Sequence, residues 1–293
     1  MSDGQAILKT SLLDLLYELR DEDSPLILGG GYGLYLKQVY RQAASDTPTV
    51  IEGEFWPAPR ATEDLDILLR TEVVMDAARM GSIRAALDRL NYTAVPGAEY
   101  MQFVKQLEGG RFVKIDLLTG PLGPLADDPR VKVDARRVRP RRSVKLHAHR
   151  TEEALGFQDN TMRIAVDGLL SSGEPYEAMV LVPSAFTLLL MKLYAFRDRC
   201  EDEEKDLARH HALDLYRVVA MMSEQEFGQT LRQIAQQQNH PVLAEAGRIV
   251  AEHFDSPESL GLLRLRSHSL WDEGMALQEF LSAMQDLFVE SRA

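Results

Sequence analysis

The stretch Arg60-Ala61-Thr62-Glu63-Asp64-Leu65-Asp66-Ile67-Leu68-Leu69 decides the fold, because two aspartates alternate with apolar residues in it. Side chains two positions apart in a β-strand point to the same face of the sheet. The pattern therefore predicts a strand over residues 62–69 with both carboxylates on one face. Two like charges at this spacing raise each other's pKa unless a cation lies between them. The pair indicates a site for a divalent cation, and the alternative is a half-solvated strand with polar residues on its wet face.

A third carboxylate, Asp116, lies in a second apolar strand pattern, Phe112-Val113-Lys114-Ile115-Asp116-Leu117-Leu118. Mg²⁺ prefers oxygen ligands and is usually held by one or two carboxylates together with substrate phosphates. Three aspartates on strands, Asp64, Asp66 and Asp116, can hold two Mg²⁺ ions, with Mn²⁺ as the alternative metal. Taken alone, Asp116 could equally be a residue near solvent at the end of a strand.

Upstream, Leu26-Ile27-Leu28-Gly29-Gly30-Gly31-Tyr32-Gly33-Leu34 places glycines between a short buried strand, 26–28, and a helix that continues to about Gln42. Backbone N–H groups and the helix dipole at such a corner favour phosphate, and glycine lets a ligand approach closely. We therefore predict that Gly30 and Gly31 bind the phosphates of a nucleotide. The alternative is that the glycines only allow a tight bend.

The remaining pattern mixes strands and helices as far as Val182 and is helical from Pro183 onward. In the first part it predicts helices at 5–20 and 72–90, a turn at 21–25, an irregular insertion at 45–59, strands at 101–107 and 111–118 that form a hairpin, and strands at 143–147, 163–166 and 178–182. In the second part it predicts helices at 185–199, 204–222, 224–237 and 241–254, and then two shorter ones. We expect an α+β protein with two domains: a mixed sheet with flanking helices (1–182) and an α-helical domain (183–293).

Composition places the chain among ordinary globular proteins, with 45% hydrophobic and 27% charged residues. Its single cysteine, Cys200, cannot form an intramolecular disulfide, which favours a reducing compartment. The first twenty residues lack the features of a signal peptide, and no segment approaches the ~20 apolar residues that span a bilayer. We expect a cytoplasmic protein without a membrane partner.

The net charge of −12 argues against broad electrostatic attraction to nucleic acid. The segment 130–150 reverses the sign, because it holds nine Lys or Arg residues and one acid, Asp134. Such a segment could bind RNA phosphates. The alternative is a basic hairpin that packs on the protein's own acidic surface. The arginines expected to contact RNA are Arg136, Arg137, Arg139, Arg141 and Arg142.

In order and context, these motifs resemble the polymerase-β-like nucleotidyltransferase superfamily: a strand, a glycine turn, a helix, Asp-x-Asp on the next strand and a later third acid. More narrowly, the chain resembles the AbiEii-type nucleotidyltransferase toxins, with their Gly-Gly-x-[Ala/Gly]-Leu and Arg-x-Thr-x-Asp-Leu-Asp motifs. The matching residues are Gly30, Gly31, Gly33, Leu34, Arg60, Thr62, Asp64, Leu65 and Asp66, followed by Pro183, Lys192, Arg199, Lys205, Asp206 and Asp214. The similarity covers roughly residues 25–220. Two features depart from it: the long interval between Gly31 and Asp64, and Tyr32 beside the glycines.

The resemblance implies a nucleotidyltransferase fold and an enzyme that transfers NMP from an NTP to an acceptor hydroxyl. The acceptor would be an RNA end such as that of tRNA, and the protein would be the toxin of a toxin–antitoxin system, with an antitoxin as partner. The implied catalytic residues are Asp64, Asp66, Asp116, Lys192 and Asp214, and the implied nucleotide-binding residues are Gly30, Gly31, Arg60, Thr62, Lys192 and Arg199.

The charged residues of the helical half have a physical interpretation of their own. Lys192 and Arg199 are seven residues apart, so on one helix they would share a face and could neutralise a triphosphate, while Asp214 would orient Lys192. The alternative is that they are surface charges on an amphipathic helix. Asp206, His210 and Asp214 have the spacing of one helical face, which a metal or solvent could occupy.

Two further functions stay open at the level of sequence. One is the same transfer to a small hydroxylated molecule or to a protein side chain. The other is a catalytically inert protein that binds a nucleotide or a partner.

Overall fold

The computed structural model describes residues 3–22, 25–44, 47–60 and 62–289. The chain forms two compact units: the first contains Met1–Leu36 and Ala61–Pro183, and the second contains Lys37–Arg60 and Ser184–Ala293. The predicted turn at 21–25 and the predicted insertion at 45–59 each include residues outside the described ranges.

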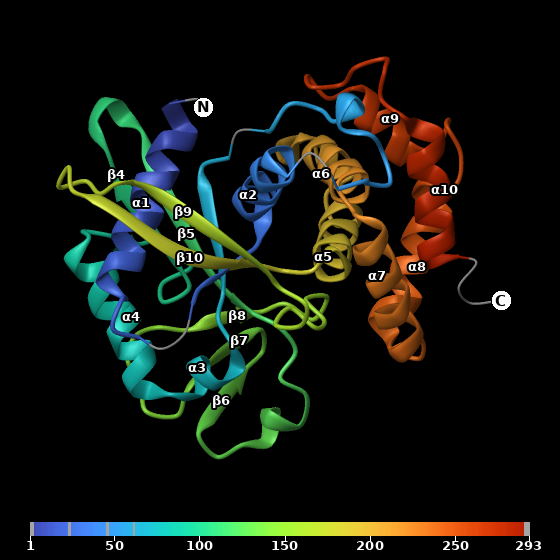
Figure 1. Ribbon diagram of the computed structural model, residues 1–293. Coiled ribbons are helices and arrows are strands. Elements are labelled where there is room, and N and C mark those ends of the chain that lie inside the picture. The colour runs from blue at the N-terminus through green and yellow to red at the C-terminus, as the bar shows by residue number, and fades with distance from the viewer. Residues whose placement is uncertain (1–2, 23–24, 45–46, 61, 290–293) are drawn as a thin grey trace. The chain divides into compact units, whose positions relative to one another are not determined.

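One mixed sheet forms the centre of the first unit (Figure 1). Its described strands are β1 (Ile27–Leu28), β2 (Asp64–Leu68), β3 (Thr93–Ala94), β4 (Gln102–Gln106), β5 (Phe112–Thr119), β6 (Val131–Asp134), β7 (Arg137–Pro140), β8 (Ala148–Arg150), β9 (Met162–Leu169) and β10 (Pro175–Val182). They follow the order β6-β7-β8-β5-β2-β1-β10-β9, and β4 pairs with both β3 and β5. β2 and β5 run parallel at the middle of this order, while β1 runs antiparallel to β2. The centre of the sheet therefore carries the strand that contains both Asp64 and Asp66.

Helices cover this sheet because their apolar faces are buried against it. The helices are α1 (Asp3–Glu18), α3 (Thr71–Met75) and α4 (Ala77–Arg89), and α2 (Gly30–Ala43) begins in the first unit and ends in the second. α1 contacts β9 and β10 through fully buried residues such as Leu12 and Leu13. Asp14 in α1 accepts a hydrogen bond from Ser171 N at 2.9 Å. The helix is thereby held to the β9–β10 hairpin.

The second unit is helical after Ser184. Its helices are α5 (Ala185–Arg197), α6 (Arg209–Ala220), α7 (Glu224–Gln236), α8 (Pro241–His253), α9 (Leu260–Arg266) and α10 (Leu277–Phe288). Phe196, Phe254 and Phe280 form an aromatic core, with ring centroids 5.0 Å apart for the first pair and 6.1 Å for the second. Ser184 caps α5, and Ser223 caps α7 in a reciprocal capping box.

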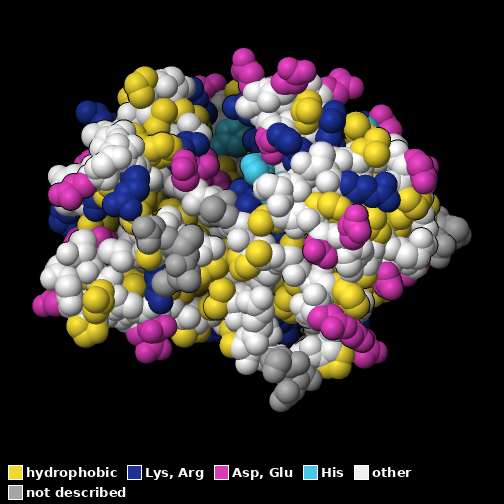
Figure 2. Space-filling model, turned by 90° about the horizontal axis from the view of Figure 1, so that it is seen from above, with side chains coloured by type: hydrophobic (Ala, Val, Ile, Leu, Met, Phe, Trp, Pro, Cys, Tyr) yellow, Lys and Arg dark blue, Asp and Glu magenta, His cyan; other side chains and the backbone are white. Residues whose placement is uncertain are grey.

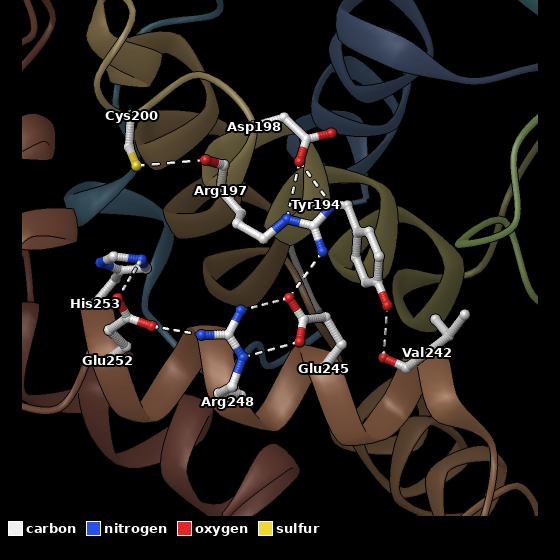
Figure 3. A network of polar contacts seen from close by, with 9 residues as sticks. All are labelled: Tyr194, Arg197, Asp198, Cys200, Val242, Glu245, Arg248, Glu252 and His253. Carbon is white, nitrogen blue, oxygen red and sulfur yellow. Dashed lines mark hydrogen bonds and ion pairs between the residues drawn. The ribbon is translucent and has the colours of Figure 1, made fainter.

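Polar contacts also join α5 to α8 (Figure 3). The Tyr194 hydroxyl donates to Val242 O at 3.1 Å, and Arg197 Nη1 lies 2.8 Å from Glu245 Oε1. Arg248 donates to the same carboxylate at 2.7 Å. Hydrogen bonds from Arg248 and Arg197 lower the pKa of Glu245 to about 2. The carboxylate is therefore ionised across the neutral range, and together with Asp198 and Glu252 it neutralises both arginines.

The expected architecture, a mixed sheet with flanking helices followed by a helical part, is confirmed. The hairpin of β4 and β5 is also as predicted. The helix predicted at 72–90 is broken at Asp76, whose carboxylate accepts from Ala78 N and Arg79 N and so begins α4. Among the described residues, no helix is both long and apolar enough to cross a bilayer.

Three further boundaries were predicted wrongly. The strand predicted at 143–147 is absent, and the chain instead forms the short strands β6, β7 and β8. The helix predicted at 204–222 begins only at Arg209, because Asp206, Leu207 and Ala208 have positive φ. The helix predicted at 185–199 ends at Arg197, so Arg199 lies beyond it.

Candidate active site

The three predicted acids lie on neighbouring parallel strands. In the register of β2 and β5, Asp64 lies opposite Lys114, and Asp66 lies opposite Asp116. Residues at paired positions point to the same face, and alternate residues do so within each strand. All four side chains therefore share one face of the sheet. The apolar residues between them are buried on the other face: Leu65, Ile67, Ile115 and Leu117.

Lys114 supplies a positive charge among these carboxylates. Its Nζ lies 2.9 Å from Asp116 Oδ2. Burial opposes the charged ammonium, but the hydrogen bond and charge of Asp116, with the charges of Asp64 and Asp66, raise the pKa of Lys114 above its usual value. The other oxygen of Asp116, Oδ1, is buried without a hydrogen-bond partner. Sequence reasoning missed Lys114, although its position two residues before Asp116 places it on the same face.

Gly30 lies directly against Asp66. It is the first residue of α2 and has a φ of 59°. A Cβ atom at this position would lie 1.6 Å from Asp66 Oδ2, so only glycine fits. The preceding Gly29 N donates to Asp66 O at 2.9 Å, which fixes the turn to β2. The N-terminus of α2, where Gly31 follows, therefore presents its positive dipole end beside an acid of the site.

Tyr32, which departs from the expected glycine-turn pattern, belongs to the core. It is 1% exposed and stacks on Tyr35 with ring centroids 5.5 Å apart. Burial raises the pKa of Tyr32 well above its usual value. The ring therefore remains a neutral packing element at the start of α2.

In the second unit, Asp214 is the centre of a cationic group. Its fully buried carboxylate accepts from Lys192 Nζ at 2.7 Å, Arg217 Nη1 at 2.9 Å and Arg60 Nη2 at 3.2 Å. Burial opposes ionisation of Asp214, but the charges of Lys192, Arg60 and Arg217 outweigh it and hold its pKa well below the usual value. One carboxylate cannot neutralise three cations, so this group keeps a positive charge that suits an anion.

Arg199 contacts His211 near this group, rather than sharing a helical face with Lys192 as predicted. Its Nη1 lies 2.6 Å from His211 Nε2. Because guanidinium only donates, Nε2 accepts and the imidazole is neutral. Burial, followed by the charges of Lys192 and Arg199, lowers the pKa of His211 well below its usual value. Lys192 and Arg199 do not share a helical face, but both lie near one imidazole.

The remaining predicted residues fall in different places. Thr62 precedes β2, and its hydroxyl accepts from Asp64 N at 3.5 Å. Asp206 lies before α6, so the predicted helical face of Asp206, His210 and Asp214 is wrong. His210 Nε2 still lies 3.4 Å from Asp206 Oδ2. His210 Nδ1 lies 2.8 Å from His268 Nε2, a pairing across 58 residues that no local spacing indicates.

Asp64, Asp66 and Asp116 are the candidate ligands of a metal ion in this sheet. Over the described ranges, no group of three or more His, Cys, Asp or Glu side chains is positioned to hold one. The donors are nevertheless of the right kind, because carboxylate oxygens suit a hard cation such as Mg²⁺. The partnerless Asp116 Oδ1 and the close packing of Gly30 on Asp66 also fit such an ion.

Comparison with known proteins adds little. No family model matches the chain, and a search of curated proteins finds no match. Among solved structures, the chain is similar to the solution structure of the antibiotic-resistance factor ANT(2'')-Ia, an aminoglycoside nucleotidyltransferase. The match has a TM-score of 0.37 and 12% sequence identity, and it covers 81% of this chain and 98% of the other.

Proposed function

We propose that this protein transfers a nucleoside monophosphate from a nucleoside triphosphate to an acceptor hydroxyl, with Mg²⁺ as cofactor. The hydroxyl oxygen attacks the α-phosphorus, the bond to the β-phosphate oxygen breaks, and pyrophosphate leaves. One observation carries the proposal: Asp64, Asp66 and Asp116 share one face of the sheet, with Gly30 packed against Asp66.

The acids would hold Mg²⁺, or Mn²⁺ in its place, as two ions. Such ions stabilise the charge on the attacking and leaving oxygens. Lys114 contacts Asp116 Oδ2 and supplies a positive charge beside that carboxylate. A bound Mg²⁺ ion would compete with Lys114 for the oxygens of Asp116. The Asp116 carboxylate is also suited to accept the proton of the acceptor hydroxyl.

Each unit, taken by itself, has groups that are suited to bind phosphate. In the first, the backbone N–H groups of Gly30 and Gly31 at the start of α2 are suited to donate to phosphate oxygens. In the second, Lys192, Arg60 and Arg199 neutralise phosphate charge, while Asp214 holds Lys192 in position through its 2.7 Å contact. Thr62 positions the start of β2 through Asp64 N.

Replacing Asp66 by asparagine tests the proposal. Asn keeps the size of the side chain but removes the charge that binds the ion. We expect Asp66→Asn to reduce transfer of α-labelled nucleotide by at least about 100-fold with an unchanged unfolding temperature. The exposed Asp159 of the same unit is the matched control, and Asp159→Asn should leave transfer unchanged. Full activity of Asp66→Asn, or no magnesium-dependent pyrophosphate release from any triphosphate, would refute the proposal.

We further propose RNA as the acceptor, because several arginines of the basic segment 130–150 have no acidic partner among the described residues. Its ion pairs with described residues are Arg130–Asp128 and Arg150–Glu152. The five arginines between these pairs form no ion pair with a described residue, and four of them are exposed: Arg136, Arg137, Arg141 and Arg142. This favours a phosphate backbone as partner over an acidic surface of the protein itself.

The biological role follows from the sequence resemblance alone: an RNA-modifying toxin, acting on an end such as that of tRNA and controlled by an antitoxin. Incubation with each labelled triphosphate and total RNA should give a labelled RNA band. Mass spectrometry of RNA, metabolites and protein from the same reaction would show label on a small molecule or a protein side chain if RNA is not the acceptor.

A further inference from the structure

The second unit contains a pocket of about 510 Å³ that the proposed chemistry does not use. It lies between the loop 54–58 and the loop 270–275, which Figure 1 shows side by side in light blue and red. Both tryptophans of the chain, Trp56 and Trp271, line it together with Phe55. Trp56 Nε1 donates to Ile51 O at 2.9 Å, which holds that ring in place.

Two carboxylates complete the pocket lining, Glu54 and Asp272. Asp272 Oδ1 accepts from Gly274 N at 2.8 Å, but neither acid forms an ion pair with any residue in the described part of the chain. Flat aromatic rings stack on nucleobases, and carboxylates accept hydrogen bonds from exocyclic amino groups. The lining therefore suits a flat ring that carries an amino group.

Each wall of the pocket is close along the chain to a residue at or near the cationic group around Asp214. Arg60, which contacts Asp214 at 3.2 Å, follows the pocket residue Ala58 by two positions, a span of at most about 7 Å. On the other wall, Leu270 N donates to His268 Nδ1 at 3.0 Å. Burial, then the charges of His210 and Arg60, lower the pKa of His268, as expected for a residue near Arg60. The pocket lining itself holds aromatic rings and acids, and Arg60 lies just beyond its Ala58 wall in the chain.

From this arrangement we infer that the pocket binds the base of a nucleotide and selects bases with an exocyclic amino group, such as cytosine, over uracil. The inference rests on the proposed function for the identity of the nucleotide. A nucleotide suits this arrangement, because its amino group would donate to the carboxylates while its phosphates would extend beyond the pocket toward Arg60. A free organic cation would satisfy Glu54 and Asp272 but would meet the like charge of Arg60.

The tryptophans provide a direct measurement, because the chain has no others. The full-length protein is titrated in Mg²⁺ with methylene analogues of CTP and UTP that cannot be cleaved between the α- and β-phosphates. These probes differ only at the edge of the base, where cytosine has a 4-amino group and an N3 acceptor and uracil has a 4-carbonyl and an N3–H donor. We expect quenching of tryptophan fluorescence, with at least about 10-fold tighter binding of the cytidine analogue.

The carboxylates are tested by Glu54→Gln and Asp272→Asn, which should each bring the preference down to less than about 3-fold, since the amide can no longer act only as an acceptor. Glu273, an exposed acid beside Asp272 that does not line the pocket, is the matched control, and Glu273→Gln should keep the full preference.

Equal binding of the two analogues, or an unchanged preference in both pocket variants, would overturn the inference. So would quenching by spermidine that neither analogue competes with, which would make the pocket a cation site. The proposed function fails separately: if the base preference is found but no triphosphate is turned over, the pocket assignment stands without the enzyme. If transfer occurs with equal binding of both bases, only the pocket assignment falls.

Discussion

At the scale of single residues, Gly30 lets Asp66 of the site pack directly against the backbone because it has no side chain. Its φ of 59° is costly for other residues, and a Cβ would overlap Asp66 Oδ2. We expect Gly30→Ala to lower the free energy of unfolding by more than the ~1–2 kcal/mol that the left-handed backbone alone costs. Nucleotide transfer should fall as well, because Asp66 must move. Urea unfolding and the labelled-nucleotide assay measure the two effects.

The matched control is Gly109→Ala. Gly109 also has a positive φ, 72°, but no atom lies within 4 Å of a Cβ built there. This variant should show the backbone cost without the overlap and should keep its activity. If the two variants lose the same stability and both transfer nucleotide normally, the close packing of Gly30 on Asp66 has no functional role.

Some of these residues were accessible from the sequence because their relation is local. The two-residue spacing of Asp64 and Asp66 predicted a shared face, and the strand register agrees with it. The placement of Lys114 among the acids and of Arg217 on Asp214 was missed. Local spacing could have indicated both, because Lys114 lies two residues before Asp116 on a strand and Arg217 three residues after Asp214 on a helix. Spacing could not show that β2 and β5 are neighbours, which brings Asp66 opposite Asp116. The catalytic roles of the acids stay predictions.

At the scale of elements, the hairpin of β6 and β7 and the two residues directly after it carry the unpaired arginines. Because each neutralised phosphate releases counterions, replacing two exposed arginines should weaken binding to single-stranded RNA whatever its sequence. The double variant Arg141→Gln, Arg142→Gln should also reduce the slope of log affinity against log salt by roughly 1.4. Fluorescence anisotropy over a range of salt concentrations measures both quantities.

A second pair of arginines provides the control for this hairpin. Arg197 and Arg248 are already paired with Asp198, Glu245 and Glu252, as Figure 3 shows. The double variant Arg197→Gln, Arg248→Gln therefore removes the same formal charge without removing free charge from a basic surface. The control should keep most of the RNA affinity and the salt slope. An equal loss in both double variants would mean that net charge, rather than the hairpin, determines binding.

The elements also differ in how well the sequence predicted them, for physical reasons. β2, β5 and the helices α5, α7 and α8 have clear alternation or helical periodicity, and each was predicted to within a few residues. β6, β7 and β8 are three or four residues long and contain arginines, so no apolar period marks them. The break before α6 was not evident from the sequence because Leu207 and Ala208 favour helix, yet both adopt positive φ here.

At the scale of the whole molecule, the charges are unevenly divided. The net charge is −12, and in Figure 2 acidic side chains are spread over the viewed face while Lys and Arg form smaller groups among them. A surface of this kind repels polyanions on average. Binding to RNA therefore depends on the local excess of arginine in residues 130–150, and it should be sensitive to salt.

The histidines make stability depend on pH, because burial is the largest cause of a lowered pKa in six of the seven. These are His147, whose pKa falls to about 4, and His149, His210, His211, His253 and His268, whose pKa values are also lowered. Below the ordinary value of 6.5 the unfolded chain takes up protons that the folded protein does not, so stability is complete above pH 6.5 and falls as the pH decreases. We expect the unfolding temperature to be lower at pH 5.8 than at pH 7.5, by roughly 5 °C.

Differential scanning fluorimetry at the two pH values measures this difference. Both values lie above the isoelectric point of about 5.1, so the protein is negatively charged in each measurement. His147→Gln removes one of these groups and should reduce the difference. An unfolding temperature that is equal at both pH values, or higher at pH 5.8, would show that the folded protein binds these protons too.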